Sequence, residues 1–137
     1  VGIKINLKNV DYNVLDGIGV RGEYDLLISN ILTEQAGDPE VFVNQYWKTN
    51  VDGSNPQNGS GYSNPEYDAL SDQLASEFDP AKRRDIIIKM EKIVQDDAAT
   101  LIFGYPQTNM VSNKSVQNAN IYPCDYYWVT KDITPAK

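Results

Sequence analysis

Residues 61–98 read GYSNPEYDALSDQLASEFDPAKRRDIIIKMEKIVQDDA, and this stretch decides most of the expected fold. Asn64 and Asp79 have side chains that cap helix N-termini, and each is followed by a proline, Pro65 and Pro80. Proline suits the first helical position, because the first amide of a helix has no partner within the helix. The sequence therefore predicts two consecutive helices, one starting at Pro65 and the other at Pro80.

Apolar residues recur at helical spacing in both segments. The expected apolar faces are Tyr67, Leu70, Leu74 and Phe78 in the first helix, and Ile86, Met90, Ile93, Val94 and Ala98 in the second. Amphipathic helices bury such a face, and we expect both helices to pack on a β-sheet. The basic cluster Lys82, Arg83 and Arg84 lies in the first turns of the second helix and is interpreted as a solvated face.

The rest of the chain is expected to supply the sheet. Alternating residues favour a half-buried strand at 1–10, and a short apolar run favours a buried strand at 24–31. Another helix is expected at 38–47, where Asp and Pro repeat the cap-and-proline pattern, followed by an exposed loop at 48–63. The remaining expected elements are a short helix around 14–15, strands at 100–105 and 107–113, and one more strand within 121–131. The expected fold class is α/β, a mixed sheet with flanking helices in a single domain.

Composition excludes several classes of function. The net charge of −7 and the pI near 4.4 argue against a nucleic-acid partner, because phosphate binding needs a basic surface. The chain has no histidine, which excludes Ser-His-Asp and Cys-His catalysis and any metal site that depends on imidazole. Cys124 is the only cysteine, so no disulfide can form within the chain. We expect no catalytic residue, no metal site and no cofactor.

Two patterns suggest chemistry but are interpreted as structural. Residues 17–22, GIGVRG, match the dinucleotide-binding spacing of glycines, but that motif requires a helix to start at the glycines. A strand is expected after them here, so they are interpreted as a turn. The spacing does not bring the carboxylates of the acidic pairs together across a cleft; these pairs are Glu34/Asp38, Glu66/Asp68 and Asp96/Asp97. Asp96 and Asp97 are expected to bond the loop that follows them.

Four blocks in order resemble the extracytoplasmic solute-binding proteins of peptide and nickel ABC transporters, solute-binding family 5. The blocks are GEYD at 22–25, GDP at 37–39, YSNPEYDAL at 62–70, and a segment from Asp-Pro through Arg83 or Arg84 to Asp-Ala at 79–98. The resemblance covers essentially the whole chain. It implies a C-terminal portion of a longer protein, holding part of the C-terminal lobe of a two-lobed periplasmic-binding-protein-like (type II) fold. Residues from about 106 to 137 would form the tail returning to the other lobe.

The resemblance also implies a ligand site in the loop after the 24–31 strand. Peptide binders of the family often have a tryptophan and an aspartate there, whereas this chain has Leu32 and Gln35, so the ligand stays open between an oligopeptide and a nickel or metal chelate. The expected ligand contacts are Asn30, Thr33, Glu34, Gln35, Tyr46 and Tyr62. The implied partners are an ABC permease and the remaining N-terminal part of the parent protein. The implied location is extracytoplasmic, in the periplasm or lipid-anchored on the outer face of the cell membrane.

Two other functional classes stay open. One is a ligand-sensing or protein-interaction module of the same fold that is not coupled to transport. The other is a hydrolase that uses carboxylates, which turnover abolished by Asp or Glu substitution would support.

Overall fold

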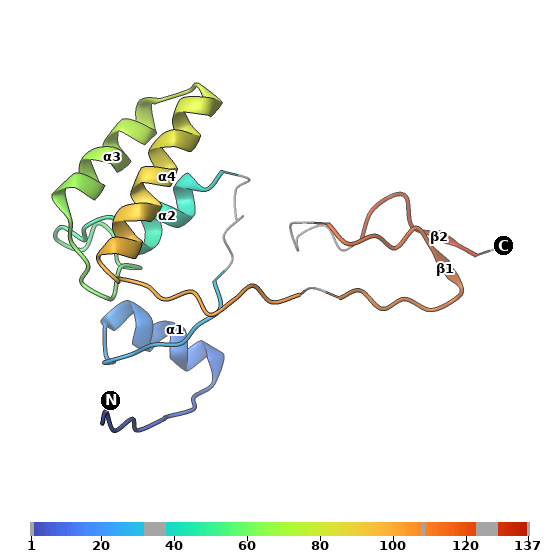
Figure 1. Cartoon of the computed structure of the whole chain (residues 1–137). Coiled ribbons are helices and arrows are strands. Elements are labelled where there is room, and N and C mark those ends of the chain that lie inside the picture. Colours follow the sequence, from blue (N-terminus) through green and yellow to red (C-terminus); the bar gives the residue numbers. More distant parts are fainter. Residues whose placement is uncertain (1, 32–37, 108, 123–128, 137) are drawn as a thin grey trace. The chain divides into compact units, whose positions relative to one another are not determined.

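The computed structural model describes residues 2–31, 38–107, 109–122 and 129–136. The chain forms two compact units, Val1–Thr100 and Leu101–Lys137, which are described separately. The first unit contains α1 (Tyr12–Arg21), α2 (Glu40–Trp47), α3 (Pro65–Ser76) and α4 (Pro80–Asp96) (Figure 1). The second contains an antiparallel pair, β1 (Val116–Gln117) and β2 (Thr134–Pro135), in which Val116 lies opposite Pro135 and Gln117 opposite Thr134.

The two predicted helix starts are confirmed. The Asn64 side chain accepts hydrogen bonds from the amides of Glu66 and Tyr67 at 2.9 and 3.2 Å, and α3 begins at Pro65. Asp79 likewise accepts from the first amides of α4 at 2.9 and 3.0 Å. These bonds satisfy amides that have no partner within a helix. The helix expected at 38–47 forms as α2, and the short helix expected around 14–15 forms as α1.

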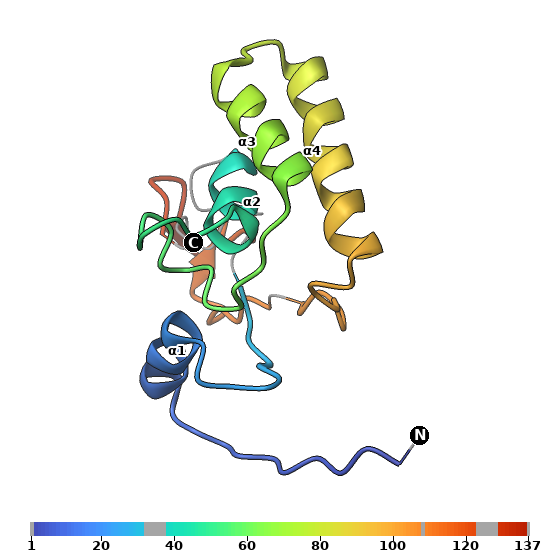
Figure 2. The same ribbon diagram turned by 90° about the vertical axis from the view of Figure 1, so that its left-hand side faces the viewer.

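α2, α3 and α4 pack around one hydrophobic core, and α3 and α4 run side by side as a hairpin (Figure 2). The core consists of Val43, Trp47, Tyr67, Leu74, Ile86, Ile87, Met90 and Val94. The buried Tyr67 hydroxyl donates to the Val43 carbonyl at 2.6 Å, which ties α3 to α2. Most of the predicted apolar faces are therefore buried, but against other helices. The expectation that these helices pack on a sheet is not met within the described residues.

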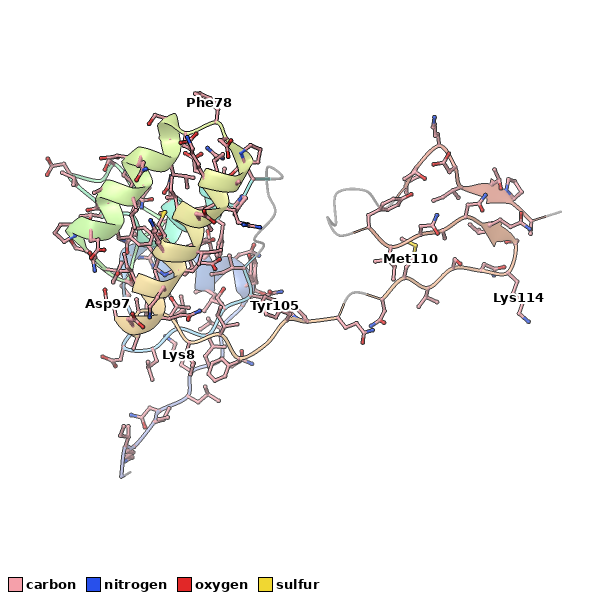
Figure 3. All side chains as sticks on the ribbon, turned by 45° about the horizontal axis from the view of Figure 1, so that its top comes forward. Lys8, Phe78, Asp97, Tyr105, Met110 and Lys114 are labelled. Atoms are coloured by element: carbon pink, nitrogen blue, oxygen red, sulfur yellow. The ribbon has the colours of Figure 1, made fainter. Side chains whose placement is uncertain are left out.

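Phe78 departs from the predicted face of α3. Its side chain is 87% exposed, because α3 ends at Ser76 and the chain turns before Phe78. The Glu77 carboxylate accepts hydrogen bonds from the amides of Phe78 and Asp79 at 3.0 and 2.9 Å, which directs the backbone into the start of α4. Figure 3 shows Phe78 at the turn of the hairpin, at the end opposite Asp97. Ala98 is also exposed and has a left-handed backbone, φ 51°, just after α4.

The strands expected at 1–10, 24–31, 100–105 and 107–113 are not formed in the described parts of these ranges. Ile3, Ile5 and Leu7 still alternate with polar residues, but they are 77%, 69% and 86% exposed. A strand needs hydrogen bonds from a neighbouring strand, and within the described residues no backbone partner lies beside 2–8. The strand expected within 121–131 falls largely on residues outside those described.

The interpretation of residues 17–22 as a turn is wrong except at Gly22, because 17–21 are the last residues of α1. Gly22 is the left-handed cap of α1, with φ 65°, and its amide bonds back to the Gly19 carbonyl. The loop residue Gly59 lies directly against this end of α1, where an added Cβ would overlap the Gly19 carbonyl oxygen. A dinucleotide site would need a helix to start at these glycines, whereas α1 ends there.

Met90→Ala should lower the free energy of unfolding by about 2–5 kcal/mol, because Met90 is fully buried between the helices. Ile88→Ala on the same helix is the matched control, since Ile88 is 54% exposed, and it should change stability by at most about 0.5 kcal/mol. Urea denaturation followed by circular dichroism measures both. Equal effects of the two substitutions would contradict the assigned core.

Gly59→Ala should detach the 55–60 loop from α1, because a methyl group cannot fit beside the Gly19 carbonyl. Gly104→Ala is the control, since nothing lies within 4 Å of the added carbon there. Thermal unfolding should show a lower midpoint for Gly59→Ala alone. A Gly59→Ala variant as stable as the parent would mean that the loop does not lie on α1.

Candidate functional site

The six predicted ligand contacts do not all fall within the described residues. Thr33, Glu34 and Gln35 lie outside them. Asn30 is described and its side chain is exposed. Tyr46 and Tyr62 are both half-buried against the helical core, but they contact different residues.

Tyr46 lies on α2 within an aromatic cluster. Its ring centroid is 5.5 Å from that of Phe42 and 6.4 Å from that of Trp47. Burial raises the pKa of its hydroxyl, and the nearby Tyr12 and Asp16 of α1 raise it further. Tyr46 therefore has a packing role against the helical core, next to Phe42 and Trp47.

Tyr62 joins the start of α3 to the end of α4, at the open end of the helix hairpin. Its hydroxyl donates to Asp97 Oδ2 at 2.6 Å, and Asn64 Nδ2 donates to the same oxygen at 2.9 Å. Burial, followed by the bond to the Asp97 carboxylate, raises the pKa of Tyr62 to about 12. The two donors in turn lower the pKa of Asp97, the bond from Tyr62 contributing most.

This arrangement corrects the interpretation of the acidic pair after α4. Asp97 bonds residues that precede α3, and the loop that follows it is not its partner. Asp96 pairs with Lys92 one turn earlier on α4, at 2.8 Å. Sequence spacing misses the Asp97 contacts because its partners lie more than 30 residues away.

Arg83 is the most heavily bonded side chain at the other end of the hairpin. Its Nη2 donates to Asp38 Oδ2 and Glu40 Oε2, both at 2.8 Å. Its Nη1 donates to the carbonyls of Leu74 and Glu77 at 2.9 and 2.8 Å. The side chain is only 17% exposed, so its interpretation as part of a solvated face is wrong, whereas Lys82 and Arg84 are exposed as expected.

Asp38 combines two roles at the start of α2. One carboxylate oxygen accepts the Glu40 amide at 2.9 Å, and the other accepts from Arg83. The pKa of Asp38 is lowered chiefly by the Glu40 amide, partly opposed by burial, and further by the Arg83 guanidinium. The structural interpretation of this carboxylate is confirmed, while Glu34, its partner in the acidic pair, lies outside the described residues.

An open groove runs beside the C-terminal end of α2. Its volume is about 580 Å³, and it is lined by Val41, Asn44, Gln45, Lys48, Thr49, Ser54 and Asn55. Asn55 is fixed in the lining of the groove, because its Nδ2 donates to the carbonyls of Asn44 and Lys48 at 2.9 and 2.7 Å. Asn58 also donates to the Lys48 carbonyl and is 3% exposed, so the loop expected to be exposed is partly buried. None of the six predicted ligand contacts lines this groove.

The described residues contain no group of three or more acidic or cysteine side chains placed to hold a metal ion. Among the described helices, none has both the length and the apolar character that a membrane crossing requires.

Comparison with known proteins gives one relevant relative. No family model matches the chain, and no solved structure matches it. The chain is 30% identical over 118 residues to the probable D,D-dipeptide-binding periplasmic protein DdpA of Escherichia coli (strain K12). This chain is similar to part of a periplasmic binding protein. The match covers 85% of the chain but 22% of the relative, so the chain spans about a fifth of the relative's length.

Asp38→Asn should reduce stability in a pH-dependent way. The folded state lowers the pKa of Asp38. The ionised carboxylate therefore contributes fully to the free energy of unfolding above the ordinary carboxyl pKa, and this contribution is lost as the pH falls through the lower pKa of the folded state. The variant should be less stable than the parent at neutral pH, and the difference should shrink below about pH 4. Urea denaturation at both pH values measures this. A difference that stays constant with pH would contradict the role of the ionised carboxylate.

Proposed function

We propose that this chain is part of an extracytoplasmic solute-binding protein that delivers a peptide ligand to an ABC permease. The observation that carries the proposal is the 30% identity to a periplasmic dipeptide-binding protein, which extends over 85% of the chain. Similarity along nearly the whole chain is stronger support than a match confined to one helix.

The proposed ligand is a short peptide. The name of the relative favours a dipeptide over a metal chelate. The proposed contacts remain Asn30, Thr33, Glu34 and Gln35, with the half-buried rings of Tyr46 and Tyr62 as apolar contacts. The Tyr62 hydroxyl already donates to Asp97, so this residue would offer the ligand its ring.

The proposed fold of the parent protein is the α/β lobe expected from the sequence. Segments 2–8 and 24–31 carry apolar side chains that are largely exposed. Unpaired backbone groups of an extended segment can pair with a further strand, which would cover these side chains. The proposed neighbours are strands of the remaining N-terminal part of the parent protein. The proposed location is outside the cytoplasm, as the name of the relative indicates for that protein.

The experiment that tests this function uses the full-length parent protein and isothermal titration calorimetry. D-alanyl-D-alanine and L-alanyl-L-alanine are titrated separately, with nickel chloride as a third titrant. Saturable one-site binding of a dipeptide is expected. Binding of nickel alone, or of none of the three, would contradict a peptide ligand, and release of free alanine would support the hydrolase alternative.

Asn30→Ala and Gln35→Ala should each weaken dipeptide binding at least about fivefold in the same titration, because each removes one polar contact. Asn6→Ala is the matched control, since Asn6 is exposed outside the proposed loop, and it should leave affinity unchanged. Unchanged affinity in both loop variants would place the ligand elsewhere.

A further inference from the structure

The pattern Asn-X-Ser, the sequon for N-linked glycosylation, occurs twice in the chain. It reads Asn-Gly-Ser at 58–60 and Asn-Lys-Ser at 113–115. The pattern alone does not distinguish the two, since both contain the asparagine that would carry the glycan and the serine that completes the sequon. The first lies in the helical unit and the second in the unit of the β1–β2 pair, so each is described by itself.

Asn113 lies at an exposed turn that leads into β1. Its carbonyl accepts from the Val116 amide at 2.9 Å, and its Oδ1 accepts from the amide and the hydroxyl of Ser115, both at 3.0 Å. All three residues of this sequon are exposed, and Figure 3 shows the Lys114 side chain pointing away from the ribbon of its unit. In the described part of the chain Asn113 Nδ2 donates no hydrogen bond, so the atom that would carry the glycan is free.

Asn58 has the same local contact but opposite surroundings. Ser60 Oγ donates to its Oδ1 at 2.9 Å, as the serine hydroxyl of the other sequon does. The Nδ2 of Asn58, however, donates to the carbonyls of Lys48 and Tyr62 at 2.9 and 2.8 Å, and the residue is 3% exposed. Both hydrogens of this amide are therefore used within the protein, and a bulky glycan has no room beside it.

We propose that Asn113 is an N-glycosylation site and that Asn58 is not, although both carry the sequon. The reaction joins Asn113 Nδ2 to C1 of a sugar, and the donor is a lipid-pyrophosphate-linked oligosaccharide. The bond from C1 to the pyrophosphate oxygen breaks, the lipid pyrophosphate leaves, and one Nδ2 proton passes to a base of the oligosaccharyltransferase. The inference goes beyond the proposed function and shares with it only the location outside the cytoplasm.

The two sites also differ in what a glycan would do to the fold. At Asn113 the contacts of the turn use Oδ1 and the backbone, so replacing one Nδ2 hydrogen breaks none of them. At Asn58 the same replacement removes a donor from the Lys48 or the Tyr62 carbonyl. Leaving a buried carbonyl without its donor destabilises the folded state. Only the site at Asn113 is therefore compatible with the folded chain.

The experiment incubates the folded full-length parent protein with a purified single-subunit oligosaccharyltransferase and a lipid-pyrophosphate-linked oligosaccharide. Glycans are released by peptide N-glycosidase in heavy-oxygen water, which marks each former site as a labelled aspartate for mass spectrometry. Asn113 should be labelled and Asn58 should not. Synthetic peptides spanning 54–62 and 109–117 are the controls, because each presents its sequon without the fold, and both should be glycosylated.

Substitutions of serine test the sequon itself. Ser115→Ala should abolish glycosylation of Asn113, because it removes the hydroxyl that lies against the carboxamide, whereas Ser115→Thr keeps a hydroxyl and should retain it. Ser112→Ala is the matched control, since Ser112 is exposed directly before the sequon, and it should leave glycosylation unchanged.

Three results would overturn the inference. One is labelling of Asn58 in the folded protein to the same extent as Asn113. Another is a folded protein that stays unlabelled at Asn113 while its peptide is glycosylated, because Asn113 would then be covered in the parent protein. The third is failure of both peptides. The dipeptide titration is independent: a parent that binds a dipeptide but is not glycosylated at Asn113 keeps the proposed function and loses this inference, and the reverse result does the opposite.

Discussion

The bonds of Arg83 organise the helical unit, because they close the end of the α3–α4 hairpin and attach α2 to it. Each bond joins the charged guanidinium to a carboxylate or a carbonyl at 2.8 or 2.9 Å, and the side chain is largely shielded from solvent. Charge-assisted hydrogen bonds of this kind are stronger than neutral ones. A salt bridge on an open surface would contribute little, whereas this guanidinium is largely shielded and also donates to the Leu74 and Glu77 carbonyls at the end of α3.

A second polar contact closes the opposite end of the same hairpin. Asp97 follows α4 and accepts from Tyr62 and Asn64, so the end of α4 is tied to the residue that caps α3. Between these two ends lies the apolar core of Tyr67, Leu74, Met90 and Val94. Asn64 thus has two roles, since its side-chain oxygen caps α3 and its Nδ2 donates to Asp97. The Asn-Pro motif at 64–65 therefore closes one end of the hairpin as well as starting α3.

The start of α2 is part of the same framework. Asp38, at the start of α2, is both a helix cap and a partner of Arg83. Tyr46 and Tyr62 also belong to this framework, because each is held by neighbours within the helical unit.

The sequence by itself determined the elements that depend on local interactions. The Asn64 and Asp79 caps, the starts of α3 and α4, and most of their buried faces follow from side-chain chemistry within a few residues. Tertiary structure alone decided which arginine of the basic cluster is buried, because the two carboxylates that bond Arg83 lie more than 40 residues before it in the sequence. It also decided the partners of Asp97 and the exposure of Phe78. The strands expected at 1–10 and 24–31 are not formed in their described parts, because a strand is completed by hydrogen bonds from neighbouring strands, and the described residues supply none there.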